Sequence, residues 1–98
     1  FAQQAQDWPR VAQIAENLGL VVQEMGDHQE AAGYFAVSLK INRDLGNWAN
    51  AAKAQRNIAY NLFQLSTTSE GGIDPDALSA SLDHYFRSLE DVGKYRPP

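Results

Sequence analysis

Two histidines are the residues of this chain whose type best suits acid–base chemistry. His28 opens one predicted helix, and His84 lies inside another, far away in the sequence. Neither belongs to an HExxH, a glycine-rich phosphate-loop or a serine-elbow pattern. Histidines are common at partly exposed positions, so we predict that both rings are partly exposed. No catalytic residue is assigned, and the chain is predicted not to be an enzyme.

A short acidic cluster is the second candidate for chemistry. Glu70, Asp74 and Asp76 carry carboxylates of the kind that bind a cation. Their spacing departs from that of an EF-hand loop, and a helix N-cap explains Asp74 more simply. The adjoining sequence GGID is too short for phosphate binding and lacks a flanking strand. We therefore predict neither a metal site nor a cofactor.

The composition limits the classes of partner. The chain has 98 residues, of which 44% are hydrophobic, as in a small globular domain or a piece of a larger one. The net charge is −4 and the 8 basic residues are scattered, which argues against nucleic acid. No apolar run is long enough to cross a bilayer. Cysteine is absent, so disulfides are excluded. We expect a soluble protein, in the cytoplasm or in an extracytoplasmic compartment.

Helical spacing of apolar residues predicts four helices and no strand, and therefore an all-α fold. The predicted helices run from Trp8 to about Met25, from Asp27 to Gly46, from Trp48 to about Leu65, and from Asp74 to a residue before Tyr95. The predicted N-caps are Asp7, Asp27, Asn47 and Asp74. Glu30 follows Asp27 by three residues, as in a capping box. Gly26 and Gly46 suit the left-handed conformation that ends helices, so successive helices are expected to form antiparallel hairpins.

The sequence repeats itself. The stretch QDWPRVAQIAENLG, which begins at Gln6, aligns with GNWANAAKAQRNIA, which begins at Gly46. The aligned pairs, each 40 positions apart, include Trp8 with Trp48, Ala12 with Ala52, and Asn17 with Asn57. A helix pair that recurs at a fixed period indicates a solenoid, in which neighbouring hairpins stack to bury their apolar faces. A large aromatic residue at a repeat junction is expected to pack on the preceding hairpin, so this is the predicted role of both tryptophans.

The repeat resembles the tetratricopeptide repeat. The residues that carry the resemblance are Leu18, Gly19, Ala31, Phe35 and Ser38 in the first copy. In the second copy the corresponding residues are Ile58 and Ala59, followed by Ser81, Tyr85 and Ser88. The small residues let the two helices approach, and the aromatic ring fills the gap between them. The last three residues are aligned at a spacing of 50, although a spacing of 47 also matches Asp44 with Asp91.

The resemblance implies a right-handed α-solenoid of stacked antiparallel hairpins. Its expected parts are the tail of a preceding repeat (1–6), one repeat (7–46), a second repeat with an insertion at 66–73 (47–94), and a C-terminal tail (95–98). The first residue is Phe1 and not Met, so we expect a piece of a longer chain or a processed one. The repeat is longer than the common family repeat. Arg43 stands where the family has a proline.

The resemblance also implies a concave face that takes an extended peptide. Its residues come from the first helix of each repeat: Gln13, Glu16, Asn17, Leu20 and Gln23, then Lys53, Arg56, Asn57, Tyr60 and Gln64. Asn17 and Asn57 are expected to clamp peptide backbone groups, because an amide both donates and accepts hydrogen bonds. Lys53 and Arg56 are expected to pair with a carboxylate of the peptide. Tyr60 would stack or donate a hydrogen bond.

Three functions are compatible with this sequence. The first is a non-catalytic scaffold segment that binds a protein or peptide. The second is a regulatory module attached to an enzyme or sensor domain. The third is a structural module whose open ends stack on copies of itself. For Glu16, Gln23 and Gln64, a solvated helix side is the favoured interpretation.

Overall fold

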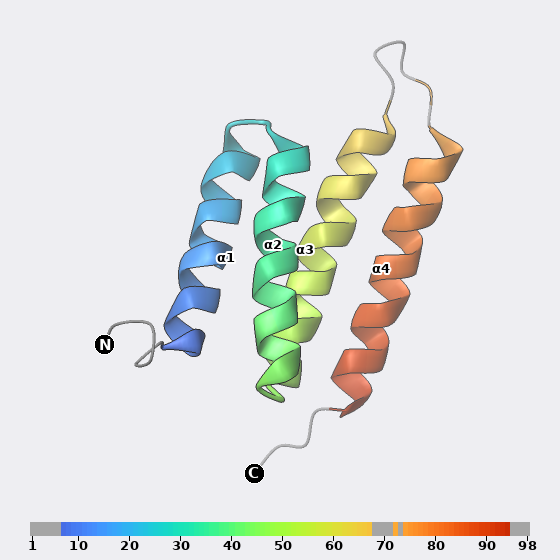
Figure 1. Cartoon of the computed structure of the whole chain (residues 1–98). Coiled ribbons are helices and arrows are strands. Elements are labelled where there is room, and N and C mark those ends of the chain that lie inside the picture. Colours follow the sequence, from blue (N-terminus) through green and yellow to red (C-terminus); the bar gives the residue numbers. More distant parts are fainter. Residues whose placement is uncertain (1–6, 68–71, 73, 95–98) are drawn as a thin grey trace.

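The computed structural model describes residues 7–67, 72 and 74–94, and within these residues the chain is all-α. The helices are α1 (Trp8–Glu24), α2 (His28–Asp44), α3 (Trp48–Ser66) and α4 (Pro75–Lys94). Each helix runs antiparallel to the next, so α1 and α3 are parallel (Figure 1). The predicted all-helical class is confirmed for these residues, which contain no strand.

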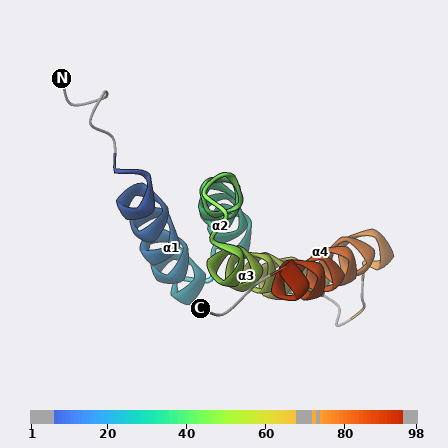
Figure 2. The same cartoon turned by 90° about the horizontal axis from the view of Figure 1, so that it is seen from below.

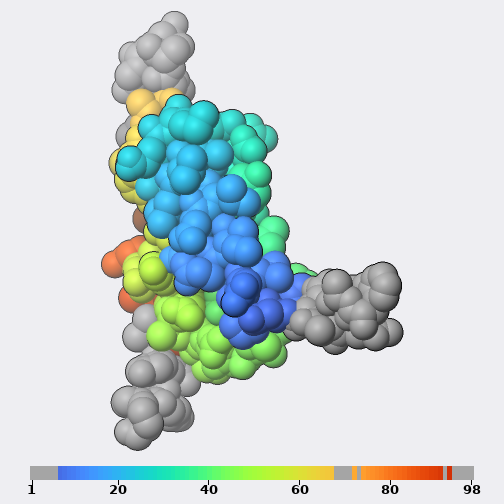
Figure 3. All heavy atoms as spheres, turned by 90° about the vertical axis from the view of Figure 1, so that its left-hand side faces the viewer, coloured from blue at the N-terminus to red at the C-terminus, as the bar shows by residue number. Residues whose placement is uncertain are grey.

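The four helices form an open row and not a closed bundle. Helix packing joins chain neighbours, α1 to α2, α2 to α3 and α3 to α4. Seen end-on, α1 and α4 lie at opposite ends of the row (Figure 2). From the side of α1, that helix lies across the front of the molecule (Figure 3). The right-handed solenoid that the resemblance implies stays a prediction.

Helix ends follow the predicted capping residues at most positions. Asp7 Oδ1 accepts a hydrogen bond from Arg10 N at 3.2 Å, and Asp27 Oδ1 accepts one from Glu30 N at 3.1 Å. Asp74 Oδ1 accepts one from Asp76 N at 3.0 Å. The joints turn through the left-handed region, which glycine tolerates because it has no Cβ: φ is 87° at Gly26 and 75° at Gly46.

Two details of the predicted caps are wrong. The Asp27 N–H donates to Val22 O at 2.9 Å, so the glycine turn at the end of α1 already uses the donor that a capping box would need. Asn47 stands at the N-cap of α3 but its side chain makes no capping hydrogen bond. Its N–H instead donates to Asn42 O at 2.8 Å, which repeats the turn at the end of α1.

The core of the first hairpin is the ring of Phe35 against Gly19. Phe35 and Ala31 are fully buried, and Ile58 from α3 joins them, with Val22, Leu39 and Leu62 packed around. A Cβ at position 19 would lie 2.9 Å from Phe35 Cε1 and Cζ. This is closer than carbon atoms approach, so the residue at position 19 must be glycine for the ring to lie where it does.

The second hairpin is packed differently. Ser81 and Ser88 are buried, and Ser81 Oγ donates to the backbone carbonyl of Ala59 at 2.6 Å. Tyr85, however, is 47% exposed and does not take the place of Phe35. Phe35 lies on α2, which packs on both α1 and α3, whereas among the described helices α4 packs on α3 alone, so less of the Tyr85 ring is covered. The predicted role of Tyr85 as the buried aromatic residue is therefore wrong.

The predicted insertion at 66–73 begins inside a helix. Ser66 is the last residue of α3, is fully buried, and donates through Oγ to the carbonyl of Phe63. Its own carbonyl accepts from the N–H of Asp74, which joins the two sides of the connection. Most of the segment, and the predicted tails at 1–6 and 95–98, lie outside the described residues.

Candidate functional site

The predicted peptide-binding residues come from α1 and α3, which are held together by an ion pair. Lys53 Nζ lies 2.7 Å from Glu16 Oε2, and the side chains are 55% and 15% exposed. Glu16 was predicted to be solvated, and this is wrong, because its carboxylate is mostly buried and pairs with Lys53 across the helices. The predicted role of Lys53 toward a peptide carboxylate stays a prediction. A partly exposed ion pair contributes about 0–1 kcal/mol to stability, so a ligand carboxylate that binds Lys53 would have to compete with Glu16.

The two asparagines of the predicted clamp differ in environment. Asn17 is exposed, and its Oδ1 accepts from Gln13 Nε2 at 3.1 Å within α1. Asn57 is half-buried, and its side chain makes no hydrogen bond within the described residues. No hydrogen bond joins the two side chains in this part of the chain. Only Asn57 therefore has its whole amide available to a ligand.

Arg56 and Tyr60 face a groove between α3 and α4. Arg56 is exposed and has no ion-pair partner within the described residues, and Tyr60 is 48% exposed. The groove has a volume of about 390 Å³. Its other lining residues are Ala59, Phe63, Leu78, Ser81, Leu82 and Tyr85. An unpaired cation thus lies beside an aromatic and aliphatic surface. Leu20, by contrast, lines a different surface at the end of α1.

A buried amide on α3 organises the junction of three helices. Asn61 is fully buried, and its Nδ2 donates to Gln23 Oε1 and to the Asn57 carbonyl, both at 2.8 Å. A carbonyl can only accept, so Asn61 Oδ1 must point the other way, toward His28 Nδ1 at 2.8 Å. His28 therefore carries its proton on Nδ1. Gln23, predicted to be solvated, is part of this network.

Sequence reasoning missed Asn61 because its repeat partner is Val21, which made the position look apolar. The available signal was an asparagine in the interior of a helix, where it is a poor helix former and needs a compensating contact. The ring of Tyr60 also meets His28 edge-on, with centroids 6.2 Å apart. These contacts hold the α1–α3 surface in one arrangement.

A second buried amide binds the other histidine. Gln55 is 1% exposed, and its Oε1 accepts a hydrogen bond from His84 Nδ1 at 2.7 Å. Burial lowers the pKa of His84 from its ordinary value of 6.5, and the nearby Arg87 guanidinium lowers that pKa further, while Asp83 opposes the shift. Both histidines are thus partly exposed, as predicted. Each donates through Nδ1 to a buried amide of α3.

An ion pair connects α2 to α4. Arg43 Nη2 lies 2.9 Å from Asp91 Oδ1, and the Asp91 side chain is fully buried while that of Arg43 is 37% exposed. Within the described residues, Arg43 Nε and Asp91 Oδ2 have no hydrogen-bond partner. Arg43, the residue that departs from the tetratricopeptide pattern, thus has a structural contact of its own.

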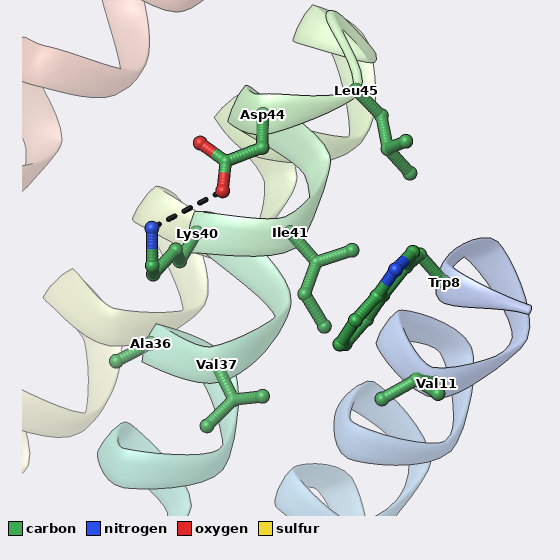
Figure 4. Close-up of a pocket in the computed structure, with 8 residues that line it drawn as sticks. All are labelled: Trp8, Val11, Ala36, Val37, Lys40, Ile41, Asp44 and Leu45. Atoms are coloured by element: carbon green, nitrogen blue, oxygen red, sulfur yellow. Dashed lines mark hydrogen bonds and ion pairs between the residues drawn. The ribbon is translucent and has the colours of Figure 1, made fainter. Parts of the chain in front are cut away.

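The start of α1 and the end of α2 enclose a larger apolar groove of about 640 Å³. The ring of Trp8 faces Ile41, and the exposed Lys40–Asp44 pair at 3.1 Å lies on the rim (Figure 4). The other lining residues are Val11, Ala36, Val37 and Leu45. Trp8 is 48% exposed, whereas its repeat partner Trp48 is half-buried. Within the described residues, Trp8 thus lacks the preceding hairpin on which it was predicted to pack.

The described residues also bear on whether the chain binds a metal ion or crosses a membrane. Across residues 7–67, 72 and 74–94, no three His, Asp or Glu side chains gather closely enough to ligate a metal ion. None of the helices described combines the length and hydropathy required to span a bilayer.

Comparison with known family models, with curated proteins and with solved structures finds no match to this chain.

Proposed function

We propose that this chain is a non-catalytic segment of a tetratricopeptide-like scaffold that binds an extended protein or peptide segment across α1 and α3. The two helices run parallel and are tied by the Glu16–Lys53 ion pair and the Gln23–Asn61 hydrogen bond. Contacts from both helices support a surface whose shape exists before the ligand arrives. Preorganisation of this kind lowers the entropy that binding must overcome.

The observation that carries the proposal is Arg56, which lies beside the apolar groove between α3 and α4 and has no ion-pair partner within the described residues. In a chain with a net charge of −4, an exposed guanidinium of this kind is the natural partner for an acidic group. Tyr60 and Phe63, both about half exposed, supply apolar surface next to it. The favoured ligand is an extended segment with an acidic residue followed by an apolar one.

The side-chain amide of Asn57 would contribute by binding the backbone of the same ligand. Its side-chain amide has no hydrogen bond within the described residues and lies on α3, one residue from Arg56. A peptide amide laid across the helix would both donate to it and accept from it. Asn17 Oδ1 already accepts a hydrogen bond from Gln13 Nε2, so part of its acceptor capacity is used within α1. Asn57 is therefore expected to contribute more than Asn17.

The test is selection of peptides from a random display library on the immobilised chain, followed by titration of the winners. We expect enrichment of acidic residues beside an apolar one. Arg56→Ala and Asn57→Ala should each weaken binding roughly tenfold, since an unmet hydrogen bond in a partly dried groove costs about 1–3 kcal/mol. The effect of Arg56→Ala should shrink in high salt.

Arg87→Ala is the matched control for Arg56→Ala. Arg87 is also an exposed helical arginine, but it lies on α4 and already pairs with Asp83 at 3.2 Å. Its removal should leave peptide affinity unchanged. If Arg56→Ala and Asn57→Ala retain both helix content and full affinity, the α1–α3 face is not the binding site.

A further inference from the structure

The outer side of α1 exposes a row of apolar residues that the repeat buries elsewhere. Ile14, Leu18 and Val21 are 50%, 42% and 56% exposed. Their repeat partners, 40 positions on in α3, are Ala54, Ile58 and Asn61, which are 3%, 4% and 0% exposed. The difference is the neighbour, because α2 packs on α3 but no described helix packs on this side of α1 (Figure 3). We call Ile14, Leu18 and Val21 the α1 outer face.

At the other end of the row, α4 exposes a second set of apolar residues, which could cover the α1 outer face. Leu82, Phe86 and Leu89 are 48%, 59% and 52% exposed, and we call them the α4 outer face. At the spacing of 50 that aligns α4 with α2, Leu89 corresponds to Leu39. Leu39 packs against the core cluster that contains Ile58. Leu89 is the same residue type in the same repeat position, and no helix within the described residues covers it.

We propose that copies of this chain assemble head to tail, with the α4 outer face of one copy on the α1 outer face of the next. The contact between α2 and α3 inside the chain is the template. There a helix carrying Leu39 covers the helix carrying Ile58. Between copies, the helix carrying Leu89 would cover the helix carrying Leu18. One chain holds both halves of this contact at opposite ends of an open row (Figure 2).

A second copy is the occupant that these surfaces fit best. None of the six residues is charged, so the contact needs no ligand of a particular sign. Each outer face has three apolar side chains that are 42–59% exposed, and apolar surface exposed in this way marks an interaction site. The two faces differ, so the interface is heterologous, and each added copy presents the same free ends again. Leu82 also lines the groove between α3 and α4, but the other five residues lie outside the proposed peptide site, and the assembly does not rest on that site.

The experiment is sedimentation and light scattering of the chain over a wide concentration range in physiological salt, which screens the repulsion between copies of net charge −4. The weight-average mass should rise with concentration above the monomer value of 10.8 kDa. Leu18→Asp and Leu89→Asp should each weaken association more than about tenfold, because each buries an unpaired carboxylate in an apolar contact. Circular dichroism checks that both variants keep their helices.

Mixing the two variants gives the sharpest test. Leu18→Asp retains an intact α4 outer face and Leu89→Asp retains an intact α1 outer face, so the mixture should form dimers and nothing larger. Leu20→Asp is the matched control. Leu20 lies on the same helix and is 41% exposed, close to the 42% of Leu18, but it follows Leu18 by two positions, which places it on the opposite side of the helix from Leu18. This variant should associate like the wild type.

Three results would overturn the proposal. One is a wild-type chain that stays monomeric up to millimolar concentration, in which case the α1 outer face takes another occupant, such as a helix of a longer chain. Another is a mixture of folded Leu18→Asp and Leu89→Asp that forms no dimer, since that excludes a head-to-tail contact. The third is a Leu20→Asp variant as defective as Leu18→Asp.

Discussion

At the scale of single residues, close packing and buried hydrogen bonds explain the sequence better than its charges do. Because position 19 is a glycine, the ring of Phe35 can lie against the backbone of α1. The buried amides Gln55 and Asn61 each accept a hydrogen bond from a histidine of a neighbouring helix. A polar group buried without a partner costs free energy, so each of these contacts also specifies which helices meet.

The substitution Gly19→Leu should destabilise the chain. The new Cβ would fall 2.9 Å from the Phe35 ring, and overpacking of a core costs about 1–3 kcal/mol. Gly33→Leu is the matched control, since a Cβ at Gly33 meets nothing within 4 Å and leucine is the better helix former. Thermal melts should therefore move down for the first variant and stay or move up for the second. Equal melting temperatures would show that α1 and α2 do not meet at this point.

The stability of the fold should fall as the pH drops below 6.5. Burial and Arg87 lower the pKa of His84 in the folded state, while the unfolded chain keeps the ordinary value of 6.5. Between 6.5 and the lower folded pKa the unfolded state binds more protons, so acid favours unfolding and stability rises with pH. Urea midpoints measured across this window should slope upward with pH. The slope should decrease in His84→Gln, and an unchanged slope would assign it to other groups.

At the scale of helices, pairs of neighbours are joined by a few polar contacts added to apolar packing. Glu16 and Lys53 join α1 to α3, and Arg43 and Asp91 join α2 to α4. In the first pair the Lys53 side chain is 55% exposed and that of Glu16 is 15% exposed, whereas the carboxylate of the second pair is fully buried. Because desolvation differs so much between them, the two ion pairs have different consequences when one partner is lost.

Arg43→Ala should destabilise the chain more than Asp91→Asn does. Removing the arginine leaves a buried carboxylate without a counter-charge, which costs up to about 3–5 kcal/mol. Removing the charge of Asp91 leaves an arginine that is 37% exposed and can reach water. Arg10→Ala, which removes an exposed pair with Asp7, should change stability by about 0–1 kcal/mol. Urea unfolding of the three variants measures the order of their stabilities. If Asp91→Asn is less stable than Arg43→Ala, the prediction is contradicted.

At the scale of the whole molecule, the open row means that each helix is stabilised mainly by packing on the helices next to it in the chain, with a few polar contacts to the helix beyond. α2 and α3 have a packed helix on both sides, whereas α1 and α4 have one on a single side. In such a row, stability is close to a sum of nearest-neighbour contacts, and the ends open more easily than the middle.

Amide hydrogen exchange should therefore be graded along the chain. At dilute concentration, the central amides of α2 and α3 should exchange more slowly than those of α1 and α4. At high concentration, the proposed assembly covers both outer faces, so protection of α1 and α4 should rise toward that of the inner helices. Exchange measured by mass spectrometry at two concentrations tests this. Uniform protection of the four helices at dilution would indicate one cooperative unit, contrary to the open row.

The amino-acid sequence by itself determined the helices and how they are joined. Apolar spacing, the aspartates at Asp7 and Asp27, and the glycines at Gly26 and Gly46 are local features that act within one turn of a helix. Local signals of this kind can be interpreted without knowing what the helix touches. The clash expected between a side chain at Gly19 and the ring of Phe35 was predictable as well, because small residues at a repeat position indicate close approach.

Only the tertiary structure decided which side chains are available to a partner. Glu16 is paired with Lys53, Tyr85 lies outside the core, and Asn61 is buried at the junction of three helices. Each outcome depends on which helices lie against the residue. Electrostatic pairing and packing depend on distances across helices, which the repeat pattern does not contain. For that reason the sequence alone could not show that, of the two predicted cations, Lys53 has an ion-pair partner within the described residues and Arg56 has none.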